Sequence, residues 1–204
     1  MRALLVDDHA LVRDALKRLL DSSYPVEVIE AASGEAALEA VAANDIDLIV
    51  LDLNLPGVGG LELLGRLVRR GGKPHLLVLT MNAEPVYVRK ALVLGAKGYV
   101  TKNASTEELL KAIRRVAAGG EYVEAEIAQA LAFDPTTGGG LNTLSHRELE
   151  ILRLLAAGRS LGEIAETIGV AYKTVANTCS RMKAKCNAPR TIDLIRMADQ
   201  LRPG

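Results

Sequence analysis

The stretch LIVLDLNLPGVGG, residues 48–60, is the most informative segment for predicting the architecture of the chain. Four apolar residues, Leu48 to Leu51, run directly into the carboxylate of Asp52, and a Pro-Gly turn follows at once. An apolar run of this length, bounded by turn residues, is typical of a strand buried on both faces of a parallel sheet. The end of such a strand is where side chains leave the core and meet solvent. The stretch therefore predicts a buried strand that places Asp52 at the rim of a sheet.

The same order of apolar run, turn and amphipathic segment repeats up to about residue 119. Apolar runs that predict strands lie at residues 3–6, 26–31, 46–51, 76–80 and 98–100. Segments with a helical period lie near residues 10–20, 34–43, 59–70, 85–94 and 106–118. Strands that alternate with helices at this spacing form right-handed βαβ units. The pattern predicts an α/β domain over residues 1–119, flavodoxin-like, with a five-stranded parallel sheet and helices on both faces.

Residues 120–143 interrupt this pattern. They contain FDPTTGGGLNT, in which Pro135 and the glycines 138–140 disfavour regular structure and predict a linker. Beyond it, two S-x-x-E motifs, beginning at Ser145 and Ser160, each predict a capping box that opens a helix. Further helices are expected at about 171–186 and 191–201. Residues 144–204 are therefore predicted to form a small all-α domain of four helices with a helix-turn-helix.

The formal net charge of zero conceals an asymmetry along the chain. Residues 1–140 hold 15 Lys and Arg against 19 Asp and Glu, a net charge of −4, whereas residues 141–204 hold 10 against 6, a net charge of +4. A basic unit suits a polyanion such as DNA. The apolar runs are far shorter than the roughly 20 residues of a bilayer span, and two acids interrupt the start MRALLVDDHA. We expect a cytoplasmic protein without a membrane segment.

Five polar side chains follow the expected strands at one edge of the sheet. They are Asp7 and Asp8 after the first strand, Asp52 after the third, Thr80 ending the fourth and Lys102 just after the fifth. Crowded carboxylates repel one another unless a cation lies between them, and oxygen ligands suit Mg²⁺. The pattern indicates phosphoryl transfer, with Asp52 as nucleophile, Thr80 as a hydrogen-bond donor and Lys102 as a neutralising charge. His9 is interpreted as a solvated residue at a helix start rather than a ligand.

The segments VDDH, LDLNLPGVGGLELL, LTM and GYVTK resemble the receiver domain of two-component response regulators, over residues 1–119. The resemblance implies that a sensor histidine kinase phosphorylates Asp52. It implies a Mg²⁺ site formed by Asp7, Asp8, Asp52 and the backbone carbonyl of Asn54. It further implies a switch pair, Thr80 and Tyr99, and pairing of two copies through the helices near residues 85–94 and 106–118.

The third helix of the C-terminal unit, KTVANTCSRMKAKC, has two distinct faces. One apolar stripe contains Val175, Cys179, Met182 and Cys186, and we expect both cysteines to be core residues rather than metal or redox groups. The opposite face carries Lys173, Asn177, Ser180 and Arg181, with Lys183 and Lys185 on its flanks. Amide and guanidinium groups read base edges, whereas lysines bind phosphates. This face is either a DNA-reading surface or an ordinary solvated basic face.

Residues 144–198 resemble the LuxR-type helix-turn-helix, which together with the receiver indicates the NarL/FixJ subfamily of response regulators. The resemblance adds Thr174 to the DNA-binding set. Ala176 and Gly162 stand where this family commonly has lysines, and Ala171 stands where a Ser usually caps the recognition helix. Losing such a cap costs about 1 kcal/mol, and lost phosphate contacts weaken binding. We therefore expect DNA binding that depends on a homodimer and an inverted-repeat operator.

Two functions remain open from the sequence. The first is a transcription regulator, not an enzyme beyond slow self-dephosphorylation, in which phosphorylation of Asp52 promotes dimerisation and operator binding. The second is an interaction module with weak or no DNA binding, in which the C-terminal unit serves dimerisation. The missing lysines favour the second function. The salt dependence of DNA binding distinguishes the two, because only phosphate contacts release counterions.

Overall fold

The computed structural model describes residues 1–57, 59–72, 74–133 and 140–199. The chain divides into two compact units, Met1–Phe133 and Asp134–Gly204. Among the described residues, no helix combines the length and the apolar character that spanning a bilayer requires.

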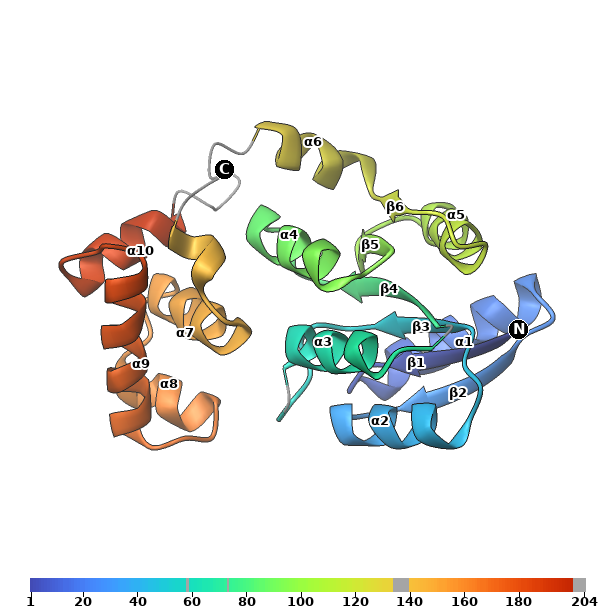
Figure 1. Cartoon of the computed structure of the whole chain (residues 1–204), viewed down its shortest axis with the longest axis horizontal. Coiled ribbons are helices and arrows are strands. Elements are labelled where there is room, and N and C mark those ends of the chain that lie inside the picture. The colour runs from blue at the N-terminus through green and yellow to red at the C-terminus, as the bar shows by residue number, and fades with distance from the viewer. Residues whose placement is uncertain (58, 73, 134–139, 200–204) are drawn as a thin grey trace. The chain divides into compact units, whose positions relative to one another are not determined.

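The N-terminal unit is a parallel sheet covered by helices on both faces (Figure 1). Its strands are β1 Arg2–Val6, β2 Glu27–Ala31, β3 Leu48–Leu51, β4 His75–Thr80, β5 Gly98–Thr101 and β6 Tyr122–Val123, in the order β2-β1-β3-β4-β5-β6. Its helices are α1 Ala10–Ser23, α2 Gly34–Ala43, α3 Gly60–Arg70, α4 Pro85–Leu94, α5 Thr106–Ala117 and α6 Ala125–Phe133. The predicted α/β class and the five predicted strands are confirmed.

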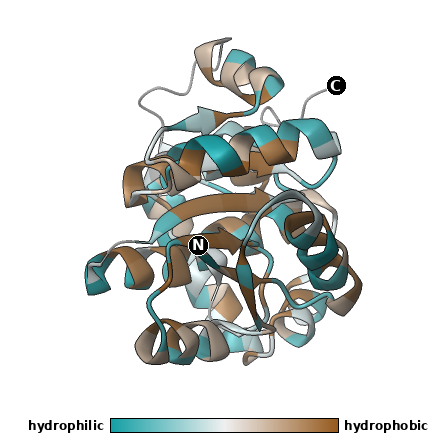
Figure 2. Ribbon diagram, turned by 90° about the vertical axis from the view of Figure 1, so that its right-hand side faces the viewer, coloured by the Kyte–Doolittle hydropathy of each residue, from teal (hydrophilic) through white to brown (hydrophobic). Residues whose placement is uncertain are grey.

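The sheet holds the core because both of its faces are apolar, as the hydrophobic central strands in Figure 2 show. Leu5, Val50 and Leu77 pack on one face with residues of α1 and α5. Successive side chains of a strand point to opposite faces, so the fully buried Leu4 and Ile49 belong to the other face. Each such burial contributes about 1.5–3 kcal/mol to the stability of the unit.

Residues 120–133 differ from the prediction, because they form β6 and α6 rather than a linker. The strand β6 pairs in parallel with β5, which makes six strands instead of five. The N-terminal unit thus extends to Phe133, beyond the expected boundary at residue 119. The physical reason is burial: Ile127 is 4% exposed and α6 packs against α4. Residues 134–139, the remaining part of the expected linker before Gly140, lie outside the described residues.

The C-terminal unit is all-α, as predicted. A 3-10 turn at Gly140–Thr143 precedes α7 His146–Ala156, α8 Leu161–Thr167, α9 Tyr172–Lys185 and α10 Thr191–Asp199. The predicted extension of the last helix to residue 201 lies outside the described residues. Both predicted capping boxes are confirmed, at Ser145 and Ser160. Gly158 and Gly169, with φ of +79° and +68°, follow α7 and α8 closely in the left-handed conformation that commonly ends helices.

Candidate functional site

The carboxyl ends of β1, β3, β4 and β5 lie at one edge of the sheet because these strands are parallel and in register. Val6 is level with Leu51, and Thr80 is level with Thr101. The structure therefore brings the residues after these strands to the same rim, as the sequence predicts. Of them, Asp7 is 3% exposed, Asp52 is 2% exposed and Thr80 is fully buried.

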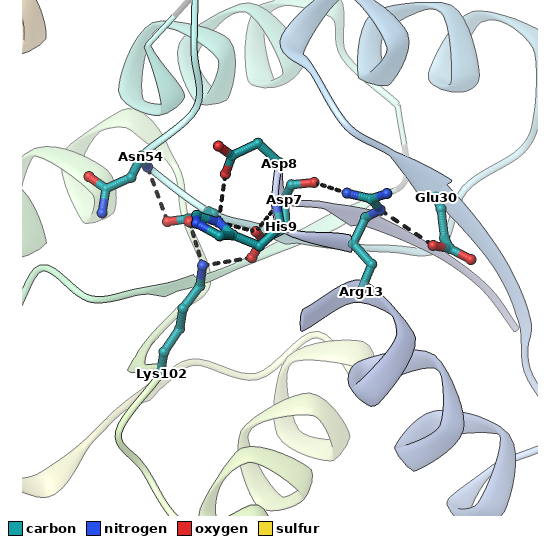
Figure 3. A network of polar contacts seen from close by, with 8 residues as sticks. Asp7, Asp8, His9, Arg13, Glu30, Asn54 and Lys102 are labelled. Carbon is teal, nitrogen blue, oxygen red and sulfur yellow. Dashed lines mark hydrogen bonds and ion pairs between the residues drawn. The ribbon is translucent and has the colours of Figure 1, made fainter. Parts of the chain in front are cut away.

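Lys102 joins two of the acids at this rim. Its Nζ lies 2.6 Å from Oδ2 of Asp52 and 2.7 Å from Oδ2 of Asp7. Figure 3 shows the Lys102 side chain directed at Asp7. Burial by itself lowers the pKa of Lys102, but the hydrogen bonds and charges of Asp52 and Asp7 outweigh burial and raise it above 10.5. The ammonium therefore stays charged at neutral pH and compensates the two buried carboxylates.

A second group of side chains lies on the other side of Asp7. The carboxylate of Asp8 is one-third exposed, and its Oδ1 lies 2.9 Å from Nδ1 of His9. Nδ1 of His9 also lies 3.2 Å from Oδ1 of Asp7. Candidate ligand atoms of Asp7, Asp8, His9 and Asp52 all lie within 4.8 Å of one another. Sequence reasoning set His9 aside as a helix-start residue; it does precede α1, but its ring also lies beside the acids.

The loop after Asp52 is held close to the strand that carries it. The backbone N–H of Asn54 donates to Oδ1 of Asp52 over 3.0 Å, and Gly60 N–H donates to the Leu53 carbonyl over 3.1 Å. A Cβ on Gly60 would lie 2.3 Å from Cα of Leu53. Only glycine permits this approach, so Gly60 lets the backbone return beside Leu53, the residue after the acid.

Asn82 is a residue of this site that sequence reasoning missed. Its Nδ2 donates to Oδ1 of Asn54 over 3.0 Å, and its backbone carbonyl accepts the Tyr99 hydroxyl over 2.8 Å. Its backbone N–H also lies 3.5 Å from Oγ1 of Thr80. Asn82 thus connects Asn54, a predicted metal ligand, to both members of the predicted switch pair. The short LTM motif, residues 79–81, indicated Thr80 but ends one residue before Asn82.

Tyr99 is fully buried, and its hydroxyl lies inside the unit. Burial, followed by the charges of Glu84, Tyr87 and Asp52, raises the pKa of Tyr99 well above 10. The phenol is therefore a neutral donor at physiological pH. The Tyr99 side chain therefore points inward, with its hydroxyl on the carbonyl of Asn82.

The faces of α9 follow the sequence prediction. Val175, Cys179, Met182 and Cys186 are all buried, and burial raises the pKa of the Cys179 thiol, as expected for a packing residue. On the opposite face the exposed side chains of Thr174, Asn177, Ser180 and Arg181 line one shallow recess. Lys173 is exposed on the first turn, and Lys183 is half-buried. Ala171, before α9, provides no side-chain cap, as predicted.

Lys185 has a partner that the sequence did not indicate. Its Nζ lies 2.7 Å from Oε2 of Glu148, whose side chain is 5% exposed at the start of α7. Burial by itself raises the pKa of Glu148, but the bonds from Lys185 and Ser145 outweigh it and lower the pKa below 4.5. Lys185 therefore joins the end of the recognition helix to α7, a role other than the predicted phosphate contact.

Two known families match the chain in succession. Residues 3–114 match the response regulator receiver domain, and residues 142–198 match the bacterial regulatory proteins of the luxR family. Response regulator UvrY of Escherichia coli strain K12 is 34% identical over 203 residues, covering 97% of this chain and 93% of that protein. Response regulator GacA of Pseudomonas aeruginosa is 32% identical, covering 97% and 95%. The chain belongs to the NarL/FixJ response regulators.

Solved structures agree with this family at the level of the whole chain. RcsB of Salmonella enterica serovar Typhimurium, bound to the promoter P1flhDC in the presence of the phosphomimetic BeF₃⁻, superposes with a TM-score of 0.68. Its identity to this regulator is 26%, and the likeness covers 98% of both chains. This response regulator therefore joins a receiver unit to a LuxR-type unit and is a DNA-binding transcription regulator.

Proposed function

We propose that phosphorylation of Asp52 by a sensor histidine kinase switches this response regulator to a homodimer that binds its operator. The observation that carries the proposal is the position of Lys102, whose ammonium lies within 2.7 Å of both Asp52 and Asp7. A cation there neutralises charge on an incoming phosphoryl group and on the acid that receives it. The buried Thr80 hydroxyl is the proposed donor to a phosphoryl oxygen.

The proposed step is an in-line displacement at phosphorus. A carboxylate oxygen of Asp52 forms a bond to phosphorus while the bond from phosphorus to the kinase histidine nitrogen breaks. The imidazole leaves with that electron pair, and the phosphoryl group adds about −1.5 to −2 charges at the rim. We propose that the regulator turns over no separate substrate and only slowly loses the phosphoryl group to water.

Mg²⁺ fits the donor set at this rim. Carboxylate oxygens crowded within 4.8 Å are the ligands that a hard divalent cation prefers. Asp7, Asp8, Asp52 and the backbone carbonyl of Asn54 are the residues proposed to hold it. The ion supplies charge that offsets the phosphoryl oxygens when it is bound.

The C-terminal unit is proposed to read double-stranded DNA through the exposed face of α9. The recess between Asn177 and Arg181 presents amide and guanidinium donors, which are the groups that read base edges. One solved structure contains two RcsB dimers bound to two parallel DNAs. A homodimer of this regulator on an inverted-repeat operator would place two such helices in successive major grooves. Because its target is DNA, we propose that it acts in the cytoplasm.

The assignment of Asp52 is tested by labelling with radioactive acetyl phosphate and Mg²⁺. We expect the wild type to take up label that hydroxylamine releases, as an acyl phosphate does. Asp52→Asn should take up none, whereas Asp14→Asn, a change of an exposed acid on α1, should label like the wild type. Persistent labelling of Asp52→Asn would show that another residue is the nucleophile.

A further inference from the structure

The segment β6–α6 is bonded directly to the strand that carries the switch residue and the lysine. The backbone N–H of Glu124, between β6 and α6, donates to the carbonyl of Tyr99 over 3.1 Å. The Glu124 carboxylate then reaches past Val100: its Oε2 accepts the Thr101 N–H over 2.7 Å and the Thr101 hydroxyl over 2.9 Å. Glu124 is 8% exposed, so these bonds are shielded from water.

Thr101 is the residue immediately before Lys102. The bonds from Thr101 to Glu124 therefore fix the backbone from which the Lys102 side chain extends. The next N–H, that of Lys102, donates to the carbonyl of Thr80 over 2.9 Å, and the Lys102 ammonium meets Asp52. An unbroken series of bonds therefore runs from Asp52 through Lys102 and Thr101 to Glu124. A charged acceptor makes each of its hydrogen bonds stronger than a neutral one would.

The far end of this series is α6. The carbonyl of Glu124 accepts the Ala128 N–H over 2.9 Å in the first turn of that helix. In the last turn of α6, the Leu131 carbonyl accepts Nη2 of Arg89 from α4 over 3.2 Å. The helix is thus held at its start by β5 and near its end by α4, and the chain continues from it to the DNA-binding unit.

We propose that Glu124 is a positioning residue that holds Thr101, and hence Lys102, in place and couples the phosphoacceptor site to α6. Coupling requires an element that both ends can bias, and β5 is that element because its rim carries Lys102 and its edge carries β6. Charge added at Asp52 pulls on Lys102, and the displacement reaches α6 through the two bonds at Thr101. The inference rests on the proposed role of Asp52.

A plain structural role for Glu124 makes a different prediction. A carboxylate before a helix is favoured by the helix dipole, so Glu124 could only stabilise the start of α6. In that case its removal loosens α6 but leaves the response of α6 to the site unchanged. Coupling instead predicts that the response itself is lost. The two roles are therefore separated by measuring the same helix with and without a phosphoryl mimic.

The test is amide hydrogen exchange of the full chain with Mg²⁺, with and without beryllofluoride. In the wild type we expect beryllofluoride to change exchange both in peptides that contain Asp52 and Thr80 and in peptides of α6. Glu124→Ala removes both buried hydrogen bonds to Thr101, and we expect its α6 to exchange on the order of tenfold faster without the mimic. Its α6 peptides should no longer respond to beryllofluoride, whereas the site peptides still respond.

Three further variants make the result decisive. Thr101→Val removes only the hydroxyl bond, and Glu124→Gln keeps an acceptor without the charge. Each variant should reduce the response of α6 to beryllofluoride. These two variants replace Glu124→Ala in the test if that variant does not fold. Glu126→Ala, an exposed Glu on the same helix, should respond like the wild type. An unchanged α6 response in the Glu124 and Thr101 variants, or a wild type whose site responds while α6 does not, overturns the inference. A wild type whose site peptides do not respond overturns the proposed role of Asp52, and the inference with it.

Discussion

At the scale of single residues, the proposed function depends on Lys102, whose ammonium lies between two buried acids. Two carboxylates at the rim are almost without solvent, and such charges are tolerated only when they are paired. Lys102 provides that pairing within the described residues, over 2.6 and 2.7 Å. The same lysine is proposed to bind the phosphoryl group. Its ion pair with Asp52 already holds it beside the proposed phosphoacceptor.

Replacement of Lys102 should therefore be costly. We expect Lys102→Met to lower the free energy of unfolding by about 3 kcal/mol at pH 7, because Asp7 and Asp52 would remain buried without their cation. Mg²⁺ should recover part of the loss and stabilise this variant more than the wild type. Urea denaturation with and without Mg²⁺ measures both effects. Lys17→Met, which removes an exposed pair with Glu30, is the control and should cost less than about 1 kcal/mol.

The pKa of Lys102 also predicts how this stability depends on pH. The pKa is raised above 10.5 in the folded protein, so the contribution is complete below 10.5 and is lost as the pH rises through the higher folded value. The difference in unfolding free energy between the wild type and Lys102→Met should stay constant from pH 7 to 9 and shrink only above about 10.5. A difference that already shrinks near pH 8 would contradict the observed pairing.

At the scale of elements, side-chain capping of helix starts differs from one helix to another along the chain. Helices α2, α5, α7 and α8 each begin after a Ser whose side chain accepts a backbone N–H. The recognition helix α9 begins after Ala171, which accepts none. The helix α9, which is proposed to read DNA, therefore has a weaker start than α7 and α8 of the same unit.

Ala171→Ser should repair this start. The backbone at Ala171 is extended, with φ −68° and ψ 145°, which resembles the conformation at Ser160, so a Ser side chain can accept an N–H of the first turn. We expect a gain of about 1 kcal/mol in the unfolding free energy of the C-terminal unit, measured by denaturation of the full chain. Ala184→Ser, on the exposed face within α9, should give no gain. An equal effect of the two substitutions would argue against capping as the cause.

The lysines of α9 should separate into two classes. Lys173 is exposed and is proposed to bind phosphate, so Lys173→Met should lower the slope of log affinity against log salt by about one unit. Lys185→Met should leave the slope unchanged and destabilise the C-terminal unit, because it leaves Glu148 buried without its cation. Salt titrations of both variants on operator DNA measure this. A wild-type slope near zero would instead favour the interaction module.

At the scale of the whole molecule, an acidic receiver and a basic DNA-binding unit share one chain. The expected pairing surface included α4 and α5, but β6 extends the sheet beyond β5 and α6 packs against α4. A second copy that used this surface would meet β6 and α6 as well as the two helices. A change in the position of α6 would therefore also change the proposed pairing surface.

Size-exclusion chromatography should reveal this change directly. We expect the wild type with Mg²⁺ and beryllofluoride to elute earlier than without the mimic, as a homodimer, because charge added at Asp52 alters the receiver surface. Asp52→Asn should elute at the same volume in both conditions. Elution of the wild type that does not shift at any concentration tested would show that phosphorylation controls DNA binding by another route.

Local pattern in the sequence determined most of the fold and the composition of the site. Apolar runs of four to six residues predict strands, and S-x-x-E motifs predict helix starts. An acid that directly follows a strand of a parallel sheet lies at the edge of that sheet. Asp7, Asp52, Thr80 and Lys102 could be predicted for this reason. The buried stripe of α9 followed equally from its helical period. These features depend on residues that are near one another in the chain.

The contacts between distant segments depend on tertiary packing and could not be predicted from the sequence. Asn82 bonds to Asn54, Glu124 to Thr101 and Lys185 to Glu148, across 28, 23 and 37 positions of sequence. No local pattern predicts such pairs, because each depends on how strands and helices pack within a unit. The same holds for β6 and α6. Their apolar residues become buried only because β6 pairs with β5 and α6 packs against α4.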